Sequence, residues 1–210
     1  MRRATLFSAV IVLLVLCPVA NADTFRFDTD PFAGSTALTT PGRQVVAGET
    51  FITFSIANDV FSLESTVFGV GSSVNFINSL AAGIPTGGVN VIVLQSFDND
   101  NNPATPFAAG NAADLIASQI TTPGPGFFIY FNQGLDLPRL VFSTDLNDNT
   151  ADLRVLFRMT NLSGQSGRDA IPTFTAANFV ITTTAVPEPS TVVLLVIGMM
   201  SAGLLRRRRP

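Results

Sequence analysis

Short runs of β-branched and aromatic residues recur along the middle of this 210-residue chain, and clusters of Gly, Pro, Asn and Asp separate them. The runs span residues 50–57, 89–97, 127–131, 139–144, 152–161 and 174–184. Runs of this length and spacing are typical of the strands of a sandwich or barrel. We therefore predict a mainly β domain, an antiparallel β-sandwich with one or two short helices.

Two of these runs alternate clearly between faces. In 50–57, one face carries Phe51, Thr53, Ser55 and Ala57, and the other carries Ile52, Phe54 and Ile56. In 152–159, one face carries Leu153, Val155 and Phe157, and the other carries Arg154, Leu156 and Arg158. The second pattern predicts a half-buried strand with a charged outer side.

Two segments do not fit strands. Residues 110–120 have Asn111 as an N-cap, an acid at Asp114, and apolar residues at helical spacing, which predicts a short helix. Residues 72–83 are ambiguous, because Val74, Ile77 and Ala81 have helical spacing whereas the content around Phe76 resembles a strand. We predict a short helix there too.

Composition excludes several kinds of site. The chain has no His, Trp or Lys, one Tyr, eighteen Phe and a single cysteine, Cys17. Cys17 lies in the N-terminal apolar run, so we expect no thiol in the exported protein. Disulfides, Ser-His-Asp triads, thiolate catalysis and zinc sites built from Cys or His are thereby excluded.

The charge of residues 23–185 limits the partners. This part holds six arginines against fourteen Asp and Glu residues, which leaves it near −8. Nucleic acid is excluded as a partner, because binding it requires a basic surface. The length matches one ordinary domain.

The N-terminus has the features of a signal peptide. Arg2 and Arg3 precede a short apolar run, and Ala20-Asn21-Ala22 is the small-x-small pattern that signal peptidase accepts. We expect residues 1–22 to be removed and the mature chain to begin at Asp23. The alternative, a retained anchor, is disfavoured because the run is short and Pro18 follows it.

Asp98, Asp100 and Asn102 offer side-chain oxygens at every second position, as the loops that bind calcium do. An EF-hand loop would continue with Gly and Glu where this chain has Pro103 and Ala109. We therefore favour a polar turn, with a weak calcium site as the alternative and no other cofactor.

Asp145, Asp148 and Asp152 follow a predicted strand closely. Paired carboxylates can hydrolyse glycosides when a cleft holds them several ångströms apart, but a hairpin loop is the commoner role of such a segment. Sugar stacking has only Tyr130 as a favourable aromatic residue. We predict no catalytic residues and no enzyme.

The C-terminal segment combines three features. Residues 191–205 are apolar, and as a helix of about 22 Å they would form a short transmembrane segment. Arg206, Arg207, Arg208 and Arg209 would stop translocation and remain in the cytoplasm. Just before the apolar run, Pro187 and Pro189 keep the chain extended and accessible.

This order, Val186-Pro187-Glu188-Pro189-Ser190, then the apolar run, then the arginines, resembles the PEP-CTERM sorting signal of Gram-negative bacteria. The resemblance implies export through the inner membrane, transient anchoring, processing by an exosortase, and a place at the cell surface or in the extracellular matrix with exopolysaccharide. Residues 137–162 and 167–179 also resemble the bodies of other PEP-CTERM proteins of unknown function.

We accordingly divide the chain into a signal peptide (1–22), an exported β domain (23–185) and a sorting signal (186–210). The function we expect is structural or adhesive. The alternatives are a glycan- or calcium-binding module and, least favoured, a carboxylate-dependent glycan hydrolase.

Overall fold

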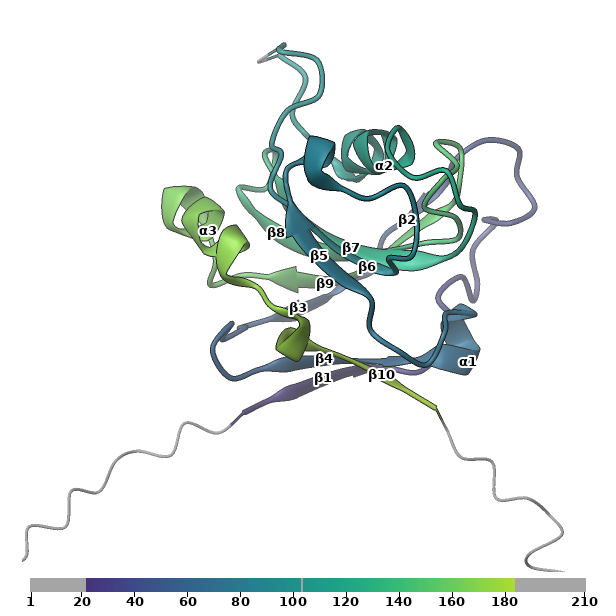
Figure 1. Cartoon of the computed structure of the whole chain (residues 1–210), viewed down its shortest axis with the longest axis horizontal. Helices are drawn as coiled ribbons and strands as arrows, with labels where there is room; N and C mark the ends of the chain where they lie inside the picture. Colours follow the sequence, from purple (N-terminus) through teal and green to yellow (C-terminus); the bar gives the residue numbers. More distant parts are fainter. Residues whose placement is uncertain (1–21, 103, 184–210) are drawn as a thin grey trace, which may run out of the picture.

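The computed structural model describes residues 22–102 and 104–183, which fold into two β-sheets and a covering helix (Figure 1). The smaller sheet has three strands in the order β1-β4-β10. These strands are β1 (Thr24–Phe27), β4 (Val60–Glu64) and β10 (Phe179–Thr182). The sorting motif, the apolar run 191–205 and the arginine cluster lie outside the described residues.

The larger sheet has the order β2-β9-β8-β7-β6-β5, and β3 also pairs with β9. Its strands are β2 (Val45–Val46), β3 (Thr50–Ile52), β5 (Phe76–Ser79), β6 (Val91–Leu94), β7 (Gly126–Asn132), β8 (Leu137–Ser143) and β9 (Leu153–Met159). The prediction of a mainly β domain is confirmed.

The predicted antiparallel pairing is wrong for most strand pairs. Within the described part of the chain, only β7–β8 and β8–β9 are antiparallel. Parallel pairs join β1 and β10 to β4, β2 and β3 to β9, and β6 to β5 and β7. The reason is the length of the connections: a tight turn allows β7 and β8 to form a hairpin, whereas the long segment containing α2 (Ala109–Ala117) returns β7 parallel to β6.

Two hydrophobic clusters hold these layers together. One lies between the sheets and is rich in phenylalanine, with Phe54 and Phe61 stacked at 4.3 Å between ring centroids. The other lies between the larger sheet and α2, where Ala112 and Ile116 pack against Phe128. Figure 1 shows α2 over one face of the larger sheet and the smaller sheet against the other.

The helix predictions have mixed outcomes. The predicted helix at 110–120 is confirmed as α2, although Asn111 lies inside it and accepts a hydrogen bond from the backbone N–H of Ala108. The helix predicted at 72–83 is wrong, because strand β5 and a 3₁₀ turn, η1 (Ala81–Gly83), occupy that segment. Its apolar residues pair with the buried strand β6, and this tertiary contact overrides the local spacing.

Other short helical elements were not predicted. They are α1 (Ser65–Phe68), α3 (Gly164–Ala170), η2 (Ile171–Thr173) and η3 (Ala176–Asn178). No helix within residues 22–102 and 104–183 is long and apolar enough to cross a membrane.

A β-bulge changes the predicted faces of β9. Leu140 pairs with Phe157 while Val141 pairs with Val155, so Leu156 is an extra residue in β9. Leu153 and Val155 therefore pack on the α2 side, whereas Leu156 and Phe157 both pack between the sheets. The predicted set Leu153, Val155 and Phe157 does not share one face, because the alternation reverses at the bulge.

Candidate functional site

A row of side chains crosses four strands of the larger sheet. Phe51 on β3 is the register partner of Arg158 on β9, which pairs with Arg139 on β8, which pairs with Tyr130 on β7. Register partners place their side chains on the same face of a sheet. We call these four residues the arginine row.

Exposure falls steadily along the arginine row. Phe51 is 64% exposed, the side chains of Arg158 and Arg139 are 24% and 12% exposed, and Tyr130 is fully buried. Tyr130 packs beside Phe107 in the cluster under α2. The row therefore begins at the open edge of the sheet and ends in the core.

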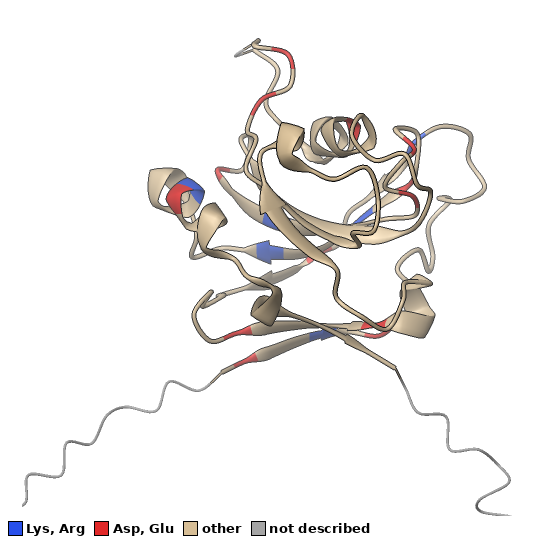
Figure 2. Cartoon of the chain, viewed as in Figure 1, with Lys and Arg blue, Asp and Glu red and all other residues tan. Residues whose placement is uncertain are grey.

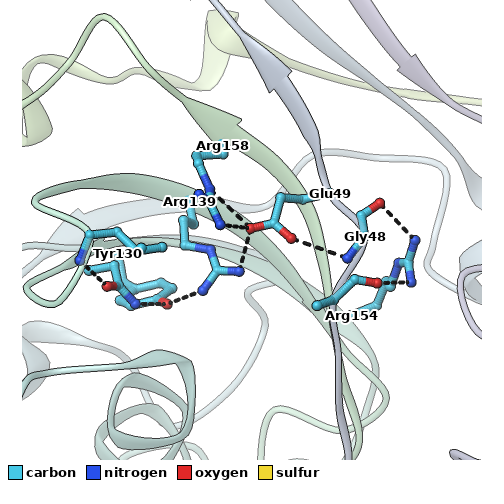
Figure 3. A network of polar contacts seen from close by, with 9 residues as sticks. Gly48, Glu49, Tyr130, Arg139, Arg154 and Arg158 are labelled. Carbon is cyan, nitrogen blue, oxygen red and sulfur yellow. Dashed lines mark hydrogen bonds and ion pairs between the residues drawn. The ribbon is translucent and has the colours of Figure 1, made fainter.

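Glu49, just before β3, binds both arginines of the row (Figure 3). Its Oε1 accepts hydrogen bonds from Nη2 of Arg139 at 2.6 Å and from Nη2 and Nε of Arg158 at 2.6 and 3.1 Å. Its Oε2 accepts the backbone N–H of Gly48 at 3.2 Å. The carboxylate side chain is only 4% exposed.

These contacts determine the charge of Glu49. Burial opposes ionisation, but backbone and Arg158 hydrogen bonds and the charge of Arg139 outweigh it and lower the pKa of Glu49 to about 2. Glu49 is thus ionised at neutral pH and balances one of its two arginines. The row keeps a local positive charge in an otherwise acidic domain.

The charge distribution agrees with this arrangement. In Figure 2, blue segments lie on strands of the larger sheet and also on the smaller sheet and α3, while red segments are spread over loops and strand ends. Arg154, also on β9, donates to the backbone carbonyls of Ala47 and Gly48 at 2.6 and 3.3 Å. These bonds hold the segment between β2 and β3, where Gly48 has a φ of +98° that favours glycine.

The inner end of the row is closed by hydrogen bonds. The Tyr130 hydroxyl accepts from Nδ2 of Asn132 at 2.8 Å and from Nη1 of Arg139 at 3.4 Å. Burial raises the pKa of Tyr130, so the phenol is neutral at ordinary pH. This end of the row is structural.

The outer end is open. The Arg158 guanidinium lies over the Phe51 ring, 4.6 Å from its centroid. Nε and Nη2 of Arg158 bind Glu49, and among the described residues Nη1 has no hydrogen-bond partner. An exposed aromatic ring and an available guanidinium edge are thereby presented side by side.

The acidic residues proposed for calcium lie in an exposed loop. Oδ1 of Asp98 accepts the backbone N–H groups of Asp100 and Asn101 at 3.0 and 3.1 Å, and Oδ1 of Asp100 accepts that of Asn102 at 2.9 Å. The backbone bond from Asp100 is the largest influence that lowers the pKa of Asp98. This geometry is that of the favoured polar turn. No group of three or more Asp, Glu, His or Cys residues that could hold a metal occurs within 22–102 and 104–183, and calcium binding stays an alternative.

The three acids considered for hydrolysis each bind different backbone groups. Oδ1 of Asp145 accepts from Gly124 and Asn147, Oδ1 of Asp148 from Thr150, and the two oxygens of Asp152 from Gln44 and Leu38. A polar hollow of about 310 Å³ near the end of α2 is lined by Asp148 and Asp114, without Asp145 or Asp152. The structure does not gather the three acids around one cavity.

At the predicted signal cleavage point, Ala20 lies outside the described residues, whereas Ala22 and Asp23 are exposed at the start of the domain. The backbone N–H of Asp23 donates to Oδ1 of Asp59 at 2.9 Å. Cleavage itself stays a prediction.

Sequence reasoning missed the arginine row. Glu49 lies 90 residues from Arg139 and 109 from Arg158, so no local motif contains them. The available signal was the charged side predicted for 152–159, but simple alternation put Arg154 and Arg158 on one face, whereas the bulge puts them on opposite faces.

The comparisons with known proteins concern the C-terminal segment. The model of the PEP-CTERM protein-sorting motif matches residues 185–209. Curated proteins and solved structures give no match. The motif implies export in a Gram-negative bacterium, membrane anchoring, and an exosortase as processing partner. The order of Pro-Glu-Pro, apolar run and arginines is thus that of a known sorting signal, and the chain carries a PEP-CTERM protein-sorting motif at residues 185–209.

Proposed function

We propose that the folded domain is a non-enzymatic structural or adhesive protein of the cell surface or extracellular matrix, where it associates with exopolysaccharide. The observation that carries this proposal is the sorting motif at residues 185–209, which follows directly on a compact β domain. β10 ends at Thr182, so only a short stretch of chain separates the domain from the motif.

The arrangement of the acidic side chains supports a non-enzymatic role. Asp145, Asp148 and Asp152 bind backbone N–H groups of the loops that they stabilise. Turnover of a polymeric glycan by the full chain, lost in Asp145→Ala or Asp148→Ala, would contradict this role and favour a hydrolase.

We expect the protein to be processed at both ends in its native host. Intact masses from membrane, surface and medium fractions should show a chain that begins at Asp23 and ends near Val186 to Pro189, located with the polysaccharide. Processed protein in the medium, free of polysaccharide, would contradict the proposed role.

A matched pair of variants tests whether the sorting motif directs this location. Glu188→Ala alters the motif and should leave the unprocessed chain in the membrane fraction. Thr184→Ala lies just outside the matched residues and should be processed like the wild type. Equal processing of both variants would show that Glu188 does not direct this location, and a wild-type chain that is intact to Pro210 in the membrane fraction would show that the tail acts only as an anchor.

A further inference from the structure

We propose that the outer end of the arginine row binds a carboxylate-bearing polysaccharide, a polymer of the uronic acid class. This inference rests on the proposed function and names the chemistry of the glycan at one defined surface. The surface consists of Phe51 and Arg158, and Arg139 lies behind them and contributes charge.

Charge complementarity is the first argument. Two arginines and one carboxylate lie together, so the surface carries a local positive charge. A guanidinium binds a carboxylate through paired N–H donors, and such charge-assisted bonds are about twice as strong as neutral ones. Glu49 holds Nε and Nη2 of Arg158, and Nη1 is the nitrogen that remains available for such a bond.

The second argument is preorganisation. Glu49 fixes both guanidinium groups, and Arg158 in turn packs on Phe51, so the ring and the donor have a defined spacing. Little side-chain entropy is then lost on binding. Phe51 is 64% exposed although it lies on a strand, which leaves apolar surface for the C–H face of a sugar ring.

An anionic membrane is a poorer match for this surface. Electrostatic attachment to lipid requires several basic residues, each contributing about 1 kcal/mol, whereas the domain as a whole is acidic. A flexible polymer can bring one carboxylate to the single open guanidinium of Arg158, and repulsion from acids more than about 8 Å away is screened at physiological salt.

The test uses the full chain in detergent solution with two immobilised polymers, polygalacturonate and neutral dextran. We expect retention on polygalacturonate alone, weakened by added salt. Arg158→Gln should weaken it by about tenfold, the effect of one lost charge-assisted hydrogen bond. Phe51→Ala, an exposed substitution that leaves the core intact, should weaken it severalfold.

Arg26→Gln is the matched control. Arg26 is an exposed arginine on the smaller sheet, paired with Asp28 at 2.9 Å, and its loss removes the same charge from a different surface. Equal retention of Arg26→Gln and Arg158→Gln would overturn the proposal, as would equal binding to dextran. Binding to phosphatidylglycerol vesicles that depends on Arg158, without binding to polygalacturonate, would assign the surface to lipid instead. Matrix association of the wild type would stand in each case, so failure here is distinct from failure of the proposed function.

A separate observation concerns the start of the domain. We infer that signal peptide removal creates an α-ammonium group at Asp23 that pairs with the buried carboxylate of Asp59. Asp59 is 4% exposed, and its Oδ1 lies 2.9 Å from the nitrogen of Asp23. The carbonyl of Asp23 also accepts the N–H of Val60, so the same residue is held from both sides.

The absence of lysine makes this inference directly measurable, because the α-amine of the processed chain is its only primary amine. A carboxylate at hydrogen-bond distance favours the charged, unreactive form of an amine. An amine-specific reagent should therefore label processed Asp59→Asn about tenfold faster than the wild type, because about tenfold more of its amine is then unprotonated and reactive.

Asp28→Asn is the control. Asp28 follows β1, at the opposite end of that strand from Asp23, so this variant should be labelled at the wild-type rate. Equal labelling of the wild type and Asp59→Asn would overturn the inference, as would a mature terminus at a residue other than Asp23. Far-UV circular dichroism of both variants establishes that the labelled proteins are folded.

Discussion

Replacing Glu49 by alanine is expected to lower the free energy of unfolding by about 3–5 kcal/mol, the range measured when one partner of a buried ion pair is removed. The substitution leaves Arg139, whose side chain is only 12% exposed, without its carboxylate, and it removes all three hydrogen bonds that Oε1 accepts. Urea unfolding of the full chain in detergent solution, followed by circular dichroism, measures the change.

Asp28→Ala is the control for this prediction. It breaks an ion pair with Arg26 of similar length, but both side chains are about half exposed. Such surface pairs contribute at most about 1 kcal/mol. If Glu49→Ala costs no more than Asp28→Ala, the network in Figure 3 contributes little to the fold.

The ionisation of Glu49 also makes the stability of the fold depend on pH. The pKa of Glu49 is about 2 in the folded protein, below its ordinary value of 4.5. A lowered folded-state pKa contributes stability that is complete above the ordinary value and is lost as pH falls toward the folded value. As the pH falls from about 4.5 to 2, the free energy of unfolding of Glu49→Gln should therefore decrease less than that of the wild type. Equal decreases in the two proteins would show that Glu49 does not cause the acid sensitivity of the wild type.

Phe61→Ala is expected to destabilise the protein by about 3–5 kcal/mol through the cavity that it leaves. Phe61 is fully buried on β4, the central strand of the smaller sheet. Its ring stacks on Phe54 with an interplanar angle of 4° and contacts Phe157 of the larger sheet at 5.4 Å between centroids. The substitution therefore removes one of the ring contacts that join the two sheets.

Phe51→Ala removes the same side chain from an exposed position and should cost less than about 1 kcal/mol, the value of its contact with Arg158. Urea unfolding of both variants in parallel tests the difference. Similar midpoints would indicate that the phenylalanine-rich cluster between the sheets is loosely packed.

Much of the architecture could be predicted from local patterns. Ile52 and Phe54 are buried while Phe51 is exposed, as the alternation in 50–57 indicates. The helix near Asn111 forms because apolar residues at helical spacing can pack on the sheet. Strands β1, β2 and β4 were not predicted and the segment of β5 was predicted as a helix, because each forms only when a neighbouring strand supplies its hydrogen bonds.

The sequence by itself determined the β-rich class and the sorting signal, because both depend on residues that are close together in the chain. The tertiary structure decided the parallel pairing and the arginine row. Periodicity shows which residues of one strand share a face, but not which strand lies beside it. The row depends on two tertiary features, the bulge at Leu156 and the pairing of β3 with β9. Together they place Phe51, Arg158 and Arg139 in line, beside Glu49.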